Sequence, residues 1–274
     1  MHRKLSLVIP AALLALLSAI FIFPDRAPAQ SGPQVVNVEV RPGVNMRYLA
    51  VPAAGQAKAA VILLAGGNGA LKLSPTGSFG DLSLNFLIRT RDQFARQGLA
   101  VAALDAAADH QGGMNGKVRM SAEYAQDVSK VIADIKKRTG VPVWLIGTSA
   151  GTLSAASVGA RGNPAPDGIV LTSTMTTLDA GHCGMTVYNA PLATIKRPVL
   201  VVSHKDDGCA CSPGKPEVGA KLIAALSAAS AKEFKLFTGG SPPRSAPCDA
   251  NSQHGYLGIE GDVVKMIADW IKAH

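Results

Sequence analysis

Ser149 has the setting in this chain that best suits covalent chemistry. It lies in the pentapeptide GTSAG (147–151), between an apolar run at 143–146 and the small-residue stretch GTLSAASVGA. A serine at the tip of a sharp strand-to-helix turn has a strained backbone, and its flanking residues must be small to avoid clashes. Such a turn presents the hydroxyl at a helix N-terminus, where the helix dipole favours developing negative charge. The pattern predicts a nucleophilic serine, and the alternative is a structural turn with an idle hydroxyl.

The elements that must position this turn follow from the apolar runs and their breakers. Buried strands are expected at 59–65, 99–104, 143–146, 168–173 and 198–203, with a further strand at 233–237. Helices are expected at 81–97, at 121–138, after Ser149, at 217–231 and at 262–273, with a loop over 105–119. A hairpin of strands 35–41 and 46–53 precedes them.

This alternation of strands and helices predicts one α/β domain over residues 30–274. Its sheet should be mostly parallel and twisted, with about eight strands, a leading β-hairpin and helices on both faces. A hydrophobic content of 47% in 274 residues is enough for one large core. In such sheets the reacting groups lie just beyond the carboxyl ends of the strands.

With this order of strands and helices, the sequence resembles the α/β-hydrolase family over essentially the whole chain after residue 29. The family's nucleophile motif, G-x-S-x-G, is matched by residues 147–151. The resemblance implies a nucleophile, an acid and a histidine in that chain order, the acid after a later strand and the histidine before the last helix. Ser149 departs from the cysteine nucleophile of the dienelactone-hydrolase branch, which argues against that specific activity.

The resemblance implies that His254 is the general base and Asp207 its acid. His254 lies in NSQHGYLGIE, directly before the expected last helix, and the pair Gly-Tyr after it is similar to the family's ending. Two adjacent acids, Asp206 and Asp207, follow the strand 198–203. The family's acid commonly comes four residues after the strand's last residue, which favours Asp207 and leaves Asp206 as the alternate. His204 in the same loop is expected to be structural.

An oxyanion hole is expected from two backbone N–H groups. Ala150 directly follows the nucleophile and supplies the first donor, while the loop LLAGGNGA supplies the second from Gly67 or Asn68. A glycine-rich loop can also bind phosphate. Neither this loop nor GGMNGKV (112–118) has the spacing of a nucleotide-binding motif.

The chain has four cysteines, and an even count in an exported protein suggests two disulfides with three connectivities. Cys209 and Cys211 are too close in sequence to pair readily with each other. A Cys209–Cys248 bridge would tie the acid loop to the histidine loop, leaving Cys183 for Cys211. The other connectivities stay open.

No metal and no cofactor is expected for this chemistry. The competing interpretation is a zinc site, but no HExxH or CxxC spacing supports it. Its ligands would come from His182, Cys183, His204, Cys209 and Cys211.

Residues 1–29 are expected to be a signal peptide. A basic start at 2–4 and an apolar run at 5–23 precede Ala27-Pro28-Ala29, a small-x-small cleavage pattern. Cleavage would place the mature protein in the periplasm or outside the cell, with no stable membrane anchor. The alternative is an uncleaved anchor, because the apolar run is nearly long enough to cross a bilayer.

Composition excludes some partners. The net charge is +8, but the basic residues are scattered and aromatic residues make up only 5% of the chain, so no nucleic-acid surface is expected. The sequence therefore predicts an exported serine hydrolase that cleaves an ester or related acyl bond in a small molecule. Thioesterase, peptidase and acyltransferase activities use the same triad and stay open. A non-catalytic binding protein with this fold is the alternative from another class, and the oligomeric state is left open.

Overall fold

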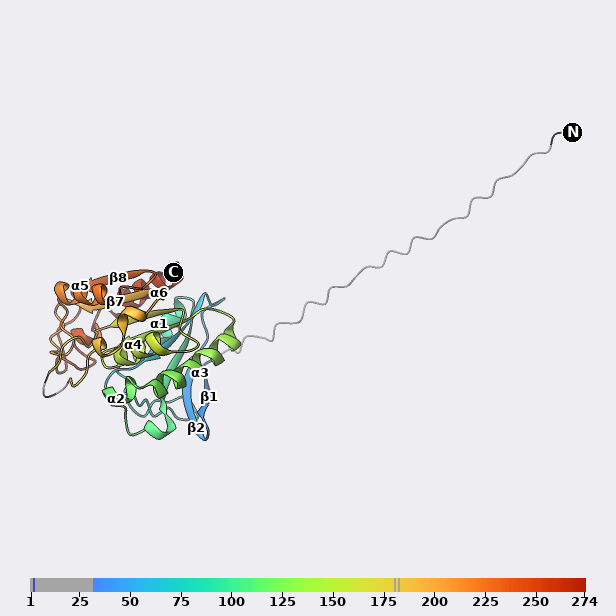
Figure 1. Cartoon of the computed structure of the whole chain (residues 1–274), viewed down its shortest axis with the longest axis horizontal. Helices are drawn as coiled ribbons and strands as arrows, with labels where there is room; N and C mark the ends of the chain where they lie inside the picture. The colour runs from blue at the N-terminus through green and yellow to red at the C-terminus, as the bar shows by residue number, and fades with distance from the viewer. Residues whose placement is uncertain (1, 3–31, 180, 182) are drawn as a thin grey trace. The chain divides into compact units, whose positions relative to one another are not determined.

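The computed structural model describes residue 2 and residues 32–179, 181 and 183–274 (Figure 1). Residues 31–274 form one compact unit. The predicted signal peptide lies outside the described residues, apart from His2, as does His182. Within the part of the chain that is described, no helix is long and apolar enough to cross a membrane.

An eight-stranded sheet forms the centre of this unit, in the order β1-β2-β4-β3-β5-β6-β7-β8. All neighbouring strands are parallel except β1 with β2 and β2 with β4, which are antiparallel. The predicted fold class, with its leading hairpin, is therefore confirmed. The strands are β1 (Gln34–Arg41), β2 (Val44–Val51), β3 (Ala59–Leu64), β4 (Leu99–Ala107), β5 (Val143–Thr148), β6 (Gly168–Thr172), β7 (Val199–His204) and β8 (Lys232–Phe237).

Helices cover both faces of the sheet, because the buried strands are apolar on both sides. Ile62 of β3 packs in one core with side chains of α3 and α4, while its neighbours Val61 and Leu63 pack in a second core with α1 and α6. The helix α3 also runs along β1 (Figure 1). The helices are α1 (Phe86–Arg96), α2 (Gly116–Arg119), α3 (Ala122–Thr139), α4 (Gly151–Arg161), α5 (Pro216–Ala225) and α6 (Glu260–Ala273).

Two predicted helices are shorter in the structure. The first begins at Phe86 instead of residue 81, because Leu82 has a positive φ of 53° and the side chain of Asn85 caps Leu87 N–H. The helix predicted to reach residue 231 ends at Ala225, where Leu226 leaves helical geometry and is fully buried in the core. The predicted loop 105–119 also contains α2 and a 3-10 turn, Ala108–His110.

The start of α4 packs against β3 with no room for a side chain. A Cβ atom on Gly151 would lie 2.0 Å from the carbonyl oxygen of Leu64, and one on Gly147 would lie 2.4 Å from the carbonyl oxygen of Gly151. The atoms that an added Cβ would meet belong to the backbone, so a rotamer change could not relieve the clash. The absence of side chains at Gly147 and Gly151 therefore lets the end of β5, the start of α4 and β3 pack closely together.

We therefore expect Gly151→Ala to lower the free energy of unfolding by at least about 2 kcal/mol, because one methyl group would overpack this junction. Urea unfolding followed by circular dichroism measures the change. Gly112→Ala is the matched control, since a Cβ there would meet nothing within 4 Å. Equal stability of the two variants would contradict the close packing of α4 on β3.

Candidate active site

Ser149 occupies a strained turn between β5 and α4. Its φ is +53°, in the left-handed region that non-glycine residues rarely adopt. Its N–H donates to Thr172 O at 3.0 Å, and its carbonyl accepts from Thr152 N at 2.9 Å. A Cβ on Gly66 would lie 2.8 Å from the Cβ of Ser149, so the loop after β3 passes directly beside the serine. The surrounding backbone therefore holds the strained conformation.

His254 and Asp207 meet across the ends of two loops. Asp207 follows β7, and its Oδ2 lies 2.9 Å from His254 Nδ1. The side chain of Asp207 is fully buried and that of His254 is 6% exposed. Asp207 Oδ1 accepts a hydrogen bond from Cys209 N at 2.9 Å, which fixes the orientation of the carboxylate. The carboxylate therefore favours the imidazole tautomer with its proton on Nδ1.

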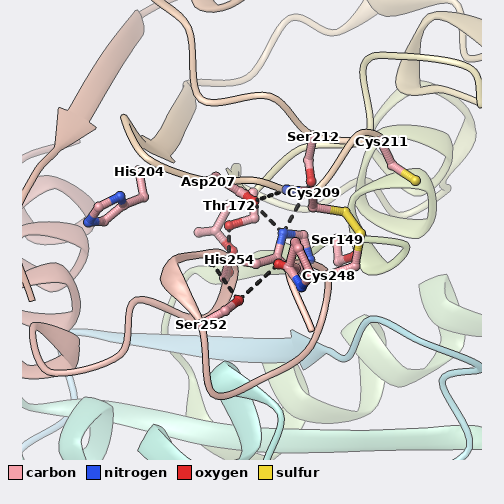
Figure 2. A network of polar contacts seen from close by, with 12 residues as sticks. Ser149, Thr172, His204, Asp207, Cys209, Cys211, Ser212, Cys248, Ser252 and His254 are labelled. Carbon is pink, nitrogen blue, oxygen red and sulfur yellow. Dashed lines mark hydrogen bonds and ion pairs between the residues drawn. A yellow bond between two sulfur atoms is a disulfide. The ribbon is translucent and has the colours of Figure 1, made fainter. Parts of the chain in front are cut away.

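The other nitrogen of His254 faces no protein partner. Among the described residues, Nε2 is buried and makes no hydrogen bond. His254 and Ser149, both labelled in Figure 2, line the same cavity of about 550 Å³. Gly67, Leu82 and other residues line it as well. A neutral imidazole with Nδ1–H bound to a carboxylate has its lone pair on Nε2 and can accept a proton there.

Several hydroxyl groups hold the histidine loop in place, and the sequence analysis did not identify them. Ser212 Oγ lies 3.1 Å from His254 Nδ1 and shares that nitrogen with Asp207. Ser173 Oγ donates to His254 O at 2.8 Å, and Ser252 Oγ accepts from His254 N at 3.2 Å. These serines carry no motif; Ser173 and Ser212 come from distant segments of the chain, while Ser252 lies two residues before His254. Only the three-dimensional structure could reveal them.

Tyr256 is a second buried anchor of this loop. Its hydroxyl donates to Val202 O at 2.9 Å and accepts from Ser173 N at 3.1 Å. Burial raises the pKa of the Tyr256 phenol well above its ordinary value, so the phenol stays protonated and keeps both bonds. Tyr256 thus ties the residues after His254 to β7 and to the segment after β6.

The alternate acid and the neighbouring histidine lie outside this group. Asp206 is exposed, and its N–H donates to His204 Nδ1 at 3.0 Å. His204 Nε2 lies 3.0 Å from Gly239 O, and its ring packs edge-on against Tyr256. His204 lies apart from Asp207 and His254 in Figure 2. The structure brings Asp207, not Asp206, to His254, and it gives His204 a structural setting.

The candidate oxyanion donors surround the serine. Ala150 directly follows Ser149 and caps α4. Gly67 lines the cavity that contains Ser149 and has a φ of +56°, a conformation that suits glycine. Within the described chain, the N–H groups of Ala150 and Gly67 donate to no protein acceptor. Asn68 is the neighbour of Gly67, and its side chain and carbonyl are engaged by Ala70 N and Met114 N.

Two disulfides hold the segments around the site. Cys209 is bonded to Cys248 (Figure 2). Cys183 is bonded to Cys211, so the pairing preferred from the sequence is the one in the structure. The Cys209–Cys248 bond links the Asp207 loop to the segment before His254. The sulfur atoms of Cys209, Cys211 and Cys248 lie within 4.8 Å of one another. Because all three sulfurs are in disulfides, this cluster offers none of the thiolates that zinc would need.

We predict that the double variant Cys209→Ser/Cys248→Ser loses about 2–4 kcal/mol of unfolding free energy, because the bond closes a loop with a sequence separation of 39. It should also lower the protection of the His254 loop against amide hydrogen exchange. Urea unfolding and exchange mass spectrometry measure the two effects. Cys183→Ser/Cys211→Ser is the matched control, which should leave protection of the His254 loop unchanged. Loss of protection to the same extent in both variants would contradict a local role for Cys209–Cys248.

Comparisons with known proteins agree with this architecture. The family model described as serine aminopeptidase, S33 matches residues 83–207, which include Ser149 and Asp207. No curated protein matches the sequence.

Three solved structures illustrate the shared fold. A dienelactone hydrolase from Anabaena variabilis is 15% identical, with a TM-score of 0.58 over 88% of this chain and 98% of that chain. Est1E from Butyrivibrio proteoclasticus is 14% identical, with a TM-score of 0.56 over 88% and 98%. A soluble variant of monoglyceride lipase from Saccharomyces cerevisiae is 12% identical, with a TM-score of 0.59 over 92% and 98%. This chain therefore has the α/β-hydrolase fold, and the family model, the strand order and the nucleophile turn together support its place in the α/β-hydrolase superfamily.

Proposed function

We propose that this protein is an exported serine hydrolase that cleaves carboxylic esters through Ser149, His254 and Asp207. The observation that carries the proposal is the orientation of His254. Its Nδ1 is bound to buried Asp207, its Nε2 makes no hydrogen bond to any described residue, and its side chain lines the cavity that also contains Ser149. Buried polar atoms are normally hydrogen-bonded, so an unpartnered imidazole nitrogen beside a strained serine suits a group that handles a proton during a reaction.

The reaction follows from this arrangement. Ser149 Oγ attacks the ester carbonyl carbon while His254 Nε2 takes the hydroxyl proton, giving a tetrahedral intermediate. The intermediate collapses, the bond to the leaving alcohol breaks, and His254 returns the proton to that alcohol. Water then attacks the acyl-enzyme with the same base, which releases the acid and restores Ser149. Throughout, Asp207 stabilises the imidazolium and remains a carboxylate.

Backbone donors would stabilise the charge on the carbonyl oxygen. Ala150 N–H lies at the start of α4, where the helix dipole also favours negative charge. The second donor belongs to the loop after β3, from Gly67 or Asn68. Gly67 lines the Ser149 cavity, and among the described residues the N–H groups of Gly67 and Asn68 both donate to no acceptor. Such a donor typically contributes about 3–4 kcal/mol to transition-state stabilisation.

An ester of small or medium size is the substrate class that we infer. Two structural neighbours are named as esterases, and Est1E has a second solved structure with ferulic acid bound. The described residues between β6 and β7 form two 3-10 turns, Val187–Asn189 and Leu192–Thr194, and no large helical lid. A thioester or a peptide is the alternative bond for the same groups, as the name of the matching family model illustrates.

Export is part of the proposal and has two supports. The first 29 residues have the pattern of a cleaved signal peptide. All four cysteines form disulfides, which persist in oxidising compartments such as the periplasm.

The first test is labelling with a fluorophosphonate probe, which reacts with activated serines. We expect the wild type to be labelled at one site and Ser149→Ala to show no labelling. Ser83→Ala and Ser245→Ala are matched controls, because both serines line the same cavity. They should be labelled like the wild type. A folded wild type that resists the probe would favour the non-catalytic binding protein over an enzyme.

The second test separates the two adjacent acids. Asp207→Asn should lower kcat for a p-nitrophenyl ester by about 10³–10⁴-fold, since the amide favours the wrong imidazole tautomer. Asp206→Asn is the control and should change kcat less than about 3-fold, because its side chain is exposed and away from His254. A large loss in Asp206→Asn with normal kcat in Asp207→Asn would overturn the assignment of the acid.

A further inference from the structure

Arg119 is a buried cation without a countercharge. It ends α2 and is 1% exposed. Its Nη1 donates to Ser154 Oγ at 3.0 Å and its Nη2 to Gly67 O at 3.1 Å, while its Nε has no partner. Across the described chain, no carboxylate forms an ion pair with this guanidinium.

This arrangement is costly for the folded protein. Burial lowers the pKa of the Arg119 guanidinium, and the ionisable group that acts on it is Tyr124. Burial raises the pKa of the Tyr124 phenol, so Tyr124 stays neutral and supplies no opposing charge. A buried ion without a partner charge destabilises the folded state, and an apolar side chain of similar volume is often more stable in such a place. Packing alone therefore gives no reason for an arginine here.

The acceptor of Arg119 lies at the candidate oxyanion loop. Gly67 O belongs to the peptide that joins Gly67 to Asn68, and in a trans peptide the N–H points opposite to the carbonyl. The bond from Arg119 therefore fixes the direction of Asn68 N–H. The preceding peptide is held as well, because Gly66 O accepts from Gly69 N at 3.1 Å. Hydrogen bonds thus fix the orientation of both peptides that flank Gly67.

The same guanidinium reaches the helix behind the nucleophile. Ser154 lies one turn after Ala150 on α4, so Arg119 connects α4 to the loop after β3. The loop packs directly over the guanidinium, since a Cβ on Gly69 would lie 2.4 Å from Arg119 Nη2. The two segments that offer the oxyanion donors are therefore joined through one charged side chain.

We propose that Arg119 is a positioning residue of the oxyanion hole, which orients the loop after β3 and adds a fixed positive charge behind it. The inference rests on the proposed serine hydrolase function. A cation hydrogen-bonded to a peptide carbonyl polarises that peptide and strengthens its N–H as a donor. A preorganised positive charge in a site that excludes water also stabilises an oxyanion more than it stabilises a neutral ester. Arg119 should thus act on the transition state and little on substrate binding.

The test compares Arg119→Met with Lys117→Met, using a p-nitrophenyl ester and the fluorophosphonate probe. Lys117 is an exposed cation on the same short helix and is the control for loss of charge. For Arg119→Met we expect kcat and the rate of phosphonylation of Ser149 to fall by about 10–100-fold, with KM changed less than about 3-fold. Lys117→Met should match the wild type in all three. Circular dichroism and urea unfolding establish that each variant is folded.

Two further variants separate positioning from a purely structural role. Arg119→Ala should recover part of its kcat in millimolar guanidinium chloride but not in sodium chloride, because the ion can enter the adjoining cavity of about 470 Å³ lined by Arg119, Gly67 and Ala150. Ser154→Ala, which removes one anchor and keeps the charge, should lower kcat several-fold at unchanged KM. If the Arg119 variants do not fold, the kcat and KM of Ser154→Ala test the proposal in their place.

The outcomes distinguish this inference from the function on which it rests. A wild type that is not phosphonylated overturns both. A wild type labelled at Ser149 together with a folded Arg119→Met variant of normal kcat overturns the role of Arg119 alone. Normal kcat in Ser154→Ala, where the Arg119 variants are unfolded, also overturns it.

Discussion

The hydrogen bond between Asp207 Oδ2 and His254 Nδ1 is the interaction on which the proposed chemistry depends. It is 2.9 Å long, and both side chains are buried. A single bond between two loop residues would not by itself fix an imidazole ring. Here Cys209 N–H donates to the carboxylate and orients it, and Ser212 Oγ lies within hydrogen-bond distance of the same imidazole nitrogen, Nδ1. The result is an oriented imidazole whose Nε2 makes no hydrogen bond to any described residue, in a side chain that lines the cavity of Ser149.

The two loops that carry this pair have little regular structure, so other contacts must hold them. The Cys209–Cys248 disulfide joins the segments before His254 and after Asp207. Ser252 and Tyr256 lie on either side of His254; the Ser252 hydroxyl binds Pro247 O and Asp249 O, and the Tyr256 hydroxyl donates to Val202 O of β7. Such an arrangement is typical of α/β folds, in which a rigid sheet supports functional loops at the carboxyl ends of its strands. Ser149 differs from the other two, since the sheet itself sets its strained turn.

The sequence predicted the parts of this site that have a local signature. The turn around Ser149 was identifiable because its small residues follow from the steric demands of the turn, and the buried strands because each is a continuous apolar run. Asp207 and Asp206 are neighbours with the same chemistry, and burial distinguishes them in the structure. Arg119 and Ser212 had no signature, because each acquires its setting from contacts between distant segments. The start of α1 and the end of α5 differ from the sequence prediction for a related reason: a positive φ at Leu82 and burial of Leu226 are tertiary effects.

The central claim is that His254 activates Ser149 for covalent attack. Rapid-quench mass spectrometry of the wild-type protein, mixed with excess p-nitrophenyl acetate, tests it most directly. We expect a burst of p-nitrophenol equal to the enzyme concentration and an acetyl group on the peptide that contains Ser149, with both absent in His254→Ala. A folded wild type with no acetyl group on Ser149, or an equal burst in His254→Ala, would contradict the account.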